Sequence, residues 1–256
     1  MRIIKKGHSF DLDDFIKNHQ EWGFSFIYEG GLDKCQPHFF KIREQLIKEQ
    51  GYICCYCQQR IDLQEGQLPK MKLEHFKPKG KEQFDKLELD YKNFLAACLG
   101  KANGQEHCDK LKHGGELKNI PNPASKEFER FKIRYIRYER QRTSPSHKEW
   151  DGYVLVAPYS EKLQENDPLT GTNEGCLNLN HQTLKSRRGS AWKGVLLAFN
   201  KKCGDKKEWH TEKGQQVAND LIKNYESPNE NGQLKEFCQV IIDSLKEEFL
   251  NTKPRA

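Results

Sequence analysis

The stretch Cys54-Cys55-Tyr56-Cys57 decides how the middle of this chain folds. Cys54 and Cys57 have two residues between them, which is the spacing of a zinc knuckle. Cys98 and Cys108 supply a candidate second pair further along the chain. Four thiolates complete a tetrahedral structural zinc site without an open position. The alternative is that these cysteines are free thiols buried in the core.

The second half of this zinc signal is less regular than the first. Nine residues separate Cys98 from Cys108, so His107 remains an alternative to Cys108 as the fourth ligand. Cys55 is left over beside the candidate ligands and is expected to be a free thiol. Four cysteines distant in the sequence are expected to behave as small buried hydrophobic side chains, and they are Cys35, Cys176, Cys203 and Cys238.

Composition bounds the class of protein. The 256 residues are 35% apolar and 31% charged, and mean hydropathy is -0.93, so no membrane span is expected. Aromatic residues make up 11%, which argues against wholesale disorder. The N-terminal residues 1–8 are basic but lack the apolar core of a signal peptide, which predicts a reducing, cytoplasmic location without disulfides. A net charge of +6 mildly favours an anionic partner.

The stretch Leu73-Glu74-His75-Phe76-Lys77-Pro78 lies between the two cysteine pairs. Adjacent residues of a strand face opposite sides of a sheet. A bend at this point would instead let the Glu74 carboxylate hold a divalent cation while the His75 imidazole addresses a water molecule beside it. A Glu-His pair alone is common in proteins and indicates little. Its position between the two candidate zinc-binding cysteine pairs is what makes it a candidate catalytic pair.

A third group of polar residues accompanies the second cysteine pair. Asn93 precedes Cys98, and Asp109 directly follows Cys108. Lys112 lies three residues beyond Asp109, and His113 lies four beyond it, which on a helix would place His113 on the same face as Asp109.

Taken in order, Cys-x2-Cys, Glu-His-x-x-Pro, Asn93, Cys98 and Cys108-Asp-x-x-Lys resemble the zinc-bearing HNH endonucleases of the ββα-metal class. This segment covers about residues 51–115. The flanks, residues 1–7 and 177–188, resemble the PtuB-type HNH proteins of Septu and retron antiphage defence systems.

The resemblance implies roles for individual residues. His75 would be the general base, and Asn93 would orient its ring. Glu74 would hold a catalytic Mg2+ or Mn2+, with Asp109 or His113 as the second ligand. A separate structural Zn2+ would hold the small catalytic element rigid.

The resemblance also implies partners. These are a PtuA-type ATPase, a nucleic acid substrate and, in a retron context, a reverse transcriptase with its msDNA. DNA and RNA, including tRNA, both remain open as substrates because the nucleophile is water. The alternative function is a catalytically inactive, zinc-stabilised nucleic-acid-binding or adaptor subunit.

Basic residues mark candidate contacts to phosphate. Lys77 and Lys112 lie beside the motifs, and Arg134 and Arg137 belong to a basic, aromatic stretch that can track a backbone and stack bases. The alternative for residues 128–142 is a half-buried strand with a solvated basic face.

The predicted fold class is α+β, with a small ββα-metal element embedded in a mostly helical protein. We expect an N-terminal helical segment over 1–50, the nuclease core over 51–120 and a helical, partner-docking region over 121–256, with the boundary at 120–125. Pro37 and Gly51 bracket one helix. The periodicity predicts further helical segments over 90–98, 181–200, 211–225 and 233–250, and strands over 70–74, 128–138 and 152–157.

Overall fold

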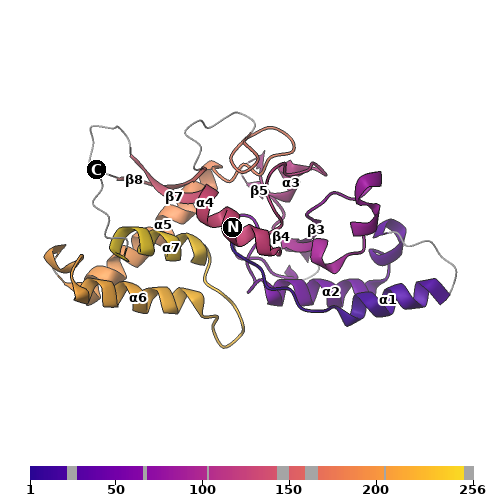
Figure 1. Ribbon diagram of the computed structural model, residues 1–256, viewed down its shortest axis with the longest axis horizontal. Coiled ribbons are helices and arrows are strands. Elements are labelled where there is room, and N and C mark those ends of the chain that lie inside the picture. Colours follow the sequence, from indigo (N-terminus) through magenta and orange to yellow (C-terminus); the bar gives the residue numbers. More distant parts are fainter. Residues whose placement is uncertain are drawn as a thin grey trace.

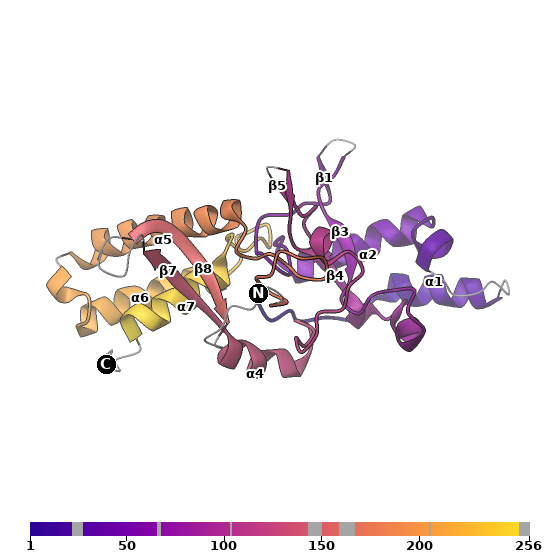
Figure 2. The ribbon, with the colours of Figure 1, turned by 90° about the horizontal axis from the view of Figure 1, so that it is seen from above.

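The chain forms an elongated molecule with two halves, shown in the computed structural model of Figure 1. The structure describes residues 1–21, 28–65, 68–102, 104–142, 150–158, 167–204 and 206–250. The N-terminal helices and the cysteine-rich region occupy one half, and the β7–β8 hairpin with the C-terminal helices occupies the other (Figures 1 and 2). Within these described ranges, helices are mixed with four two-stranded sheets, which agrees with the predicted α+β class.

Two helices form the outer wall of the N-terminal half. Helix α1 (Phe10–Glu21) packs against α2 (Gln36–Glu49). A turn of π-helix, η1 (Tyr28–Leu32), lies between them in the sequence and contacts α2. The helix predicted between Pro37 and Gly51 is therefore confirmed. Pro37 lies in the first turn of α2, where its missing N–H costs no hydrogen bond.

A hairpin and a short helix form the middle of the chain. Strand β3 (Lys72–His75) pairs antiparallel with β4 (Phe94–Ala97), with His75 opposite Phe94. Helix α3 (Asp109–Lys112) follows. Two small hairpins flank them, and they consist of β1 (Gln64–Glu65) with β2 (Leu68–Pro69) and β5 (Lys101–Ala102) with β6 (Gln105–Glu106).

The helical segment predicted over 90–98 is wrong. Only Tyr91–Asn93 forms a turn of 3-10 helix, η3, and Phe94–Ala97 is strand β4. All four residues of β4 are buried, and their pairing with β3 overrides the helix propensity of its two alanines. Another 3-10 turn, η2 (Glu82–Leu87), lies between the two strands.

The predicted strand over 128–138 is correct only at its end. Helix α4 (Lys126–Tyr135) takes up most of it, and β7 (Ile136–Arg142) begins afterwards. Ser125 precedes the helix and Glu127 lies in its first turn, and these are helix-start signals that outweigh the alternation of aromatic and basic residues. The strand predicted over 152–157 lies within β8 (Trp150–Pro158), which pairs antiparallel with β7.

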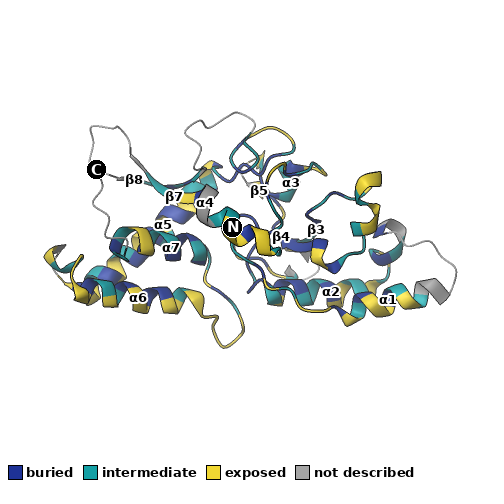
Figure 3. Cartoon of the chain, in the orientation of Figure 1, coloured by how far each residue is buried: buried dark blue, intermediate teal, exposed yellow. Residues whose placement is uncertain are grey.

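Three helices and their short extensions complete the C-terminal half. They are α5 (Gln182–Cys203), η4 (Lys206–Glu208), α6 (Glu212–Glu226), α7 (Cys238–Leu245) and the π turn η5 (Lys246–Leu250). The helices predicted over 181–200 and 211–225 are confirmed, and the third begins later than expected. Figure 3 shows buried and exposed residues alternating along these helices, as amphipathic helices require.

Helix α5 lies unusually close to strand β8. A Cβ atom at Gly189 would lie 1.6 Å from the carbonyl oxygen of Gly152, so only glycine fits there. The neighbouring Arg188 is buried, and its guanidinium donates hydrogen bonds to the carbonyl oxygens of Val154 (2.9 Å) and Leu179 (2.8 Å). The buried charge therefore satisfies backbone acceptors and fixes the helix on the hairpin.

The C-terminal residues return to the cysteine-rich region. The Phe237 N–H donates to the Gln58 carbonyl at 3.0 Å, and the Gln239 N–H donates to the Gln58 side chain at 2.9 Å. The Leu234 N–H donates to the Gly51 carbonyl at 3.0 Å. Contacts thus cross the boundary predicted at 120–125, and the division into segments 1–50, 51–120 and 121–256 stays a prediction. Within the described ranges, no helix has both the length and the apolar character needed to span a bilayer.

Candidate metal centre and adjacent cleft

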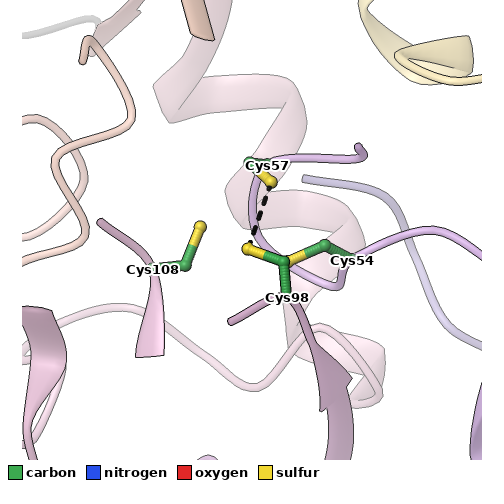
Figure 4. A group of neighbouring side chains, drawn as sticks. All are labelled: Cys54, Cys57, Cys98 and Cys108. Carbon is green, nitrogen blue, oxygen red and sulfur yellow. Dashed lines mark hydrogen bonds between the residues drawn. The ribbon is translucent and has the colours of Figure 1, made fainter. Parts of the chain in front are cut away.

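Four cysteines from three segments meet in one buried cluster (Figure 4). Cys54 and Cys57 come from the loop after α2, Cys98 directly follows β4, and Cys108 directly precedes α3. Their sulfur atoms all lie within 4.8 Å of one another, and the Cys57 and Cys98 sulfurs are 3.8 Å apart. A tetrahedral zinc with Zn–S bonds of about 2.3 Å separates its thiolates by about 3.8 Å. The cluster therefore fits a structural zinc ion.

The environment of the cluster favours a thiolate at Cys54, whereas burial raises the pKa of the Cys108 thiol well above its ordinary value. Burial alone raises the pKa of the Cys54 thiol, but hydrogen bonds from the surrounding thiols, Cys108 first among them, hold its pKa well below the ordinary value. His107 lies beside the cluster, with Nδ1 at 3.2 Å from the Cys108 sulfur and 4.0 Å from the Cys98 sulfur. Because the four thiols already form a closed group, His107 is a neighbour that can hydrogen-bond to the Cys108 thiolate.

The remaining cysteines lie outside the cluster. Cys55 is buried, and burial raises the pKa of its thiol well above the ordinary value. Cys176, Cys203 and Cys238 are buried as expected, whereas Cys35 is only half-buried.

A cleft of about 430 Å³ opens next to this cluster. Glu74 and His75 both line it, although neighbours in a strand normally face opposite sides. All four residues of β3, Lys72–His75, line the cleft, and His75 is the last of them. The other lining residues come from η1, α2, β3, α3 and the loops after β3 and α3, and they are Tyr28, Phe39, Arg43, Met71, Lys72, Leu73, Pro78, Lys79, Asp109, Lys112 and Gly114.

Two buried donors hold the Glu74 carboxylate. The Tyr56 hydroxyl and the Lys112 ammonium each lie 2.7 Å from Glu74 Oε1. Burial raises the pKa of Glu74 to about 8, helped by the neighbouring carboxyl of Asp109 and opposed by Lys112. Burial also raises the pKa of Tyr56 well above its usual range, so its hydroxyl stays protonated and donates.

Asp109 provides the second carboxylate of the cleft. Burial alone would raise its pKa, but the hydrogen bond with Glu74 and the charges of Lys72 and Lys112 lower it. The Lys72 ammonium is 3.3 Å from its Oδ2. Glu74 and Asp109 thus have opposite pKa shifts, as two close carboxyl groups do when they share one proton. A divalent cation would neutralise both, so this donor set fits Mg2+ or Mn2+.

His113 does not join Asp109 in the cleft. Helix α3 ends at Lys112, and His113 caps it in the left-handed conformation, with φ of 44°. Residues four apart share a helix face only where the helix is continuous, and here the helix ends before His113, whose side chain is exposed. The expectation that His113 can replace Asp109 as a metal ligand is therefore corrected.

The His75 ring is held on three sides. Its Nε2 atom lies 3.0 Å from the Glu88 carbonyl oxygen, and the rings of Tyr28 and Phe94 pack edge-on at centroid distances of 4.6 and 4.9 Å. Burial lowers the pKa of His75 to about 4. The imidazole is therefore neutral at neutral pH. A proton on Nε2, donated to Glu88, leaves the Nδ1 lone pair as the acceptor.

Asn93 makes contacts that differ from those expected. Its side chain accepts from the Lys77 N–H at 2.7 Å and donates to the carbonyl oxygens of Lys77 and Leu87, each at 3.0 Å. These bonds fix the backbone that follows His75, and the contact on the His75 ring nitrogen comes from Glu88 instead. Asn93 therefore acts on the loop and reaches the ring only through the backbone.

The basic residues predicted to contact phosphate have different surroundings. Lys77 is half-buried and pairs with Glu116 at 2.5 Å. Lys112 is buried against Glu74, which corrects its expected role as a surface contact, since only 1% of its side chain is exposed. Arg137 is exposed on β7, in the half of the molecule away from β3 (Figures 1 and 2). The side chain of Arg134 lies outside the described residues.

The sequence patterns do not single out several residues that line the cleft or support it. Tyr56 donates to the cleft residue Glu74, and the signal for it in the sequence is its position between the candidate zinc ligands Cys54 and Cys57. Tyr28 and Arg43 come from segments far from the motifs. Arg43 donates to the Met71 carbonyl at 2.8 Å, a contact that no local pattern announces.

Comparison with known proteins gives one distant relative. No family model matches the chain. Over 118 residues it is 25% identical to a protein of Escherichia coli named "Retron Ec83 putative HNH endonuclease". The alignment covers 45% of this chain and 39% of the relative, so the chain spans about two fifths of the length of the protein that it matches.

Proposed function

We propose that this chain is a metal-dependent HNH endonuclease that hydrolyses phosphodiester bonds in DNA or RNA. One observation carries the proposal: Glu74, Asp109 and His75 share one cleft beside a four-cysteine cluster. The similarity to a retron protein that bears the HNH name supports it. The succession of β3, β4 and α3, with the hairpin β5–β6 between β4 and α3, supports the proposal of a ββα-metal element, and Cys98 and Cys108 lie directly after β4 and directly before α3.

The two carboxylates would hold the catalytic cation. Bound between Glu74 and Asp109, Mg2+ or Mn2+ would neutralise the charge that develops on the phosphate and the leaving oxygen. Neutral His75 accepts a proton from the attacking water through Nδ1, because its Nε2 faces the Glu88 carbonyl. The cations of the cleft, among them Arg43, Lys72 and Lys79, would attract the substrate backbone.

The cellular role proposed is that of the effector subunit in an antiphage defence complex in the cytoplasm. The partner would be a PtuA-type ATPase, as the PtuB-like flanks indicate. The name of the relative adds a retron context, in which a reverse transcriptase and its msDNA would also be present.

A second candidate is a catalytically inactive, zinc-stabilised subunit that binds nucleic acid or serves as an adaptor. The contact that favours it is the Lys112–Glu74 ion pair, because a buried ammonium already neutralises the carboxylate without a metal ion. In this case the cleft would bind the backbone without cutting it.

One experiment separates these functions and identifies the substrate. The purified chain, alone and with its ATPase partner, is incubated with plasmid DNA and with total RNA, in Mg2+, in Mn2+ and in EDTA. We expect cleavage that needs the divalent ion and is lost in His75→Ala. His8→Ala is the matched control, because His8 is exposed and lies outside the cleft. Binding without cleavage in every arm, or full activity of His75→Ala, would overturn the endonuclease proposal.

A further inference from the structure

Tyr56 connects the cysteine cluster to the carboxylate of the cleft. It lies in the loop between Cys54 and Cys57, so both ends of its short segment belong to the candidate zinc site. Its side chain is buried, and its hydroxyl donates to Glu74 Oε1 at 2.7 Å. A hydrogen bond from a neutral donor to a carboxylate is stronger than one between neutral groups.

The two oxygens of Glu74 have unequal surroundings. Oε1 accepts from both Tyr56 and Lys112, each at 2.7 Å, and Lys112 is itself fixed by a second bond to the His75 carbonyl at 2.8 Å. A carboxylate oxygen offers two lone pairs in its plane, so these donors use the capacity of Oε1. Oε2 is then the oxygen left for the hydrogen bond with Asp109, and a cation held by both carboxylates would take the place of the shared proton there.

We propose that Tyr56 is a positioning residue, which orients Glu74 from within the zinc loop so that Oε2 faces the catalytic cation. This inference rests on the proposed function, because it needs a divalent ion at Glu74 and Asp109. Groups that hydrogen-bond to a metal ligand fix its orientation and commonly change metal affinity by about 10- to 100-fold.

The position of Tyr56 gives this contact its precision. A tyrosine side chain has few rotatable bonds, and zinc coordination on both sides restricts the backbone that carries it. Lys112, by contrast, carries the charge that compensates the buried carboxylate, so its removal would disturb folding as well as orientation. Tyr56→Phe removes the hydroxyl alone and is the cleaner change.

The test measures metal affinity and does not depend on cleavage. Mn2+ binding to the full zinc-loaded chain is followed by electron paramagnetic resonance of the free ion, for the wild type, Tyr56→Phe and the control Tyr52→Phe. Tyr52 belongs to the same loop, but within the described residues the tyrosine of this loop that donates to Glu74 is Tyr56, so Tyr52→Phe tests the loss of a nearby hydroxyl. Zinc content and thermal unfolding are measured on the same samples.

The expected result is a rise of about tenfold in the Mn2+ dissociation constant of Tyr56→Phe. Its zinc content should equal that of the wild type, and Tyr52→Phe should bind Mn2+ normally. Equal Mn2+ affinity of Tyr56→Phe and the wild type would overturn this inference and leave the proposed function standing. A wild-type chain that binds no Mn2+ would overturn both, and weaker Mn2+ binding that merely follows zinc loss would assign Tyr56 to the zinc site alone.

Discussion

Substitution of Asn93 by alanine separates two roles that this residue can have. The structure gives its side chain three hydrogen bonds, one from the Lys77 N–H and one each to the carbonyls of Lys77 and Leu87. Each is worth about 1 kcal/mol, and buried partners left unsatisfied raise the cost, so we expect Asn93→Ala to destabilise the fold by about 3 kcal/mol. For a chain of this size, that corresponds to a fall in Tm of about 6–12 °C.

Thermal and denaturant unfolding of the zinc-loaded chain measures this loss. The control is Asn122→Ala, because Asn122 is more exposed and makes fewer hydrogen bonds, one to the Lys92 carbonyl and one from the Ala124 N–H. We expect it to cost about 1 kcal/mol. If Asn93 instead acted mainly on the His75 ring, Asn93→Ala would slow cleavage while its Tm stayed near that of Asn122→Ala. That outcome would refute the backbone-fixing role.

Three further predictions follow from packing, burial and ligation. Gly189→Ala should destabilise the fold by about 3 kcal/mol because the added Cβ would overlap the backbone of β8. Gly194→Ala, in open space on the same helix, should instead stabilise the fold by about 0.5–1 kcal/mol, and urea unfolding measures both free energies. Burial lowers the pKa of Lys6 to about 7, so between pH 7 and 10.5 the unfolded chain binds more protons than the folded one and stability should rise with pH. From pH 7 to 9 the gain is about 2 kcal/mol, and a Lys6→Met variant that shows the same rise would contradict it. Cys57→Ala should lose zinc and Cys55→Ala should keep it, as measured by colorimetric zinc release, and equal zinc contents would exclude the four-cysteine site.

The candidate site depends partly on local sequence features and partly on contacts between distant segments. The ligand spacing of Cys54 and Cys57 and the Glu74-His75 pair are local features, so the chemistry of the residues alone pointed to them. Cys98 and Cys108 come together because β4 ends directly before Cys98 and α3 begins directly after Cys108. In the sequence, what indicated that these two cysteines form the second pair was their order along the chain.

The errors arose where distant contacts overrode local pattern. Residues 94–97 look helical because of their alanines, but they are buried against β3 and become a strand. His113 fits a helical face only if α3 continues, and Gly114 follows with another positive φ, so the helix ends. Asn93 is fixed to Lys77, sixteen residues away in the chain, through a loop whose path no periodicity reveals.

The loop that carries Cys54 and Cys57 reaches both halves of the molecule. Within it, Tyr56 contacts Glu74 in the cleft, and Gln58, the residue after Cys57, accepts hydrogen bonds from Phe237 directly before α7 and from Gln239 in its first turn. A metal ion that fixes this loop therefore fixes two contacts at once, one toward the cleft and one toward the C-terminal helices. The C-terminal half is thus connected to Glu74 through three consecutive residues of one loop, Tyr56, Cys57 and Gln58, and a zinc ion bound by Cys57 would hold the middle one.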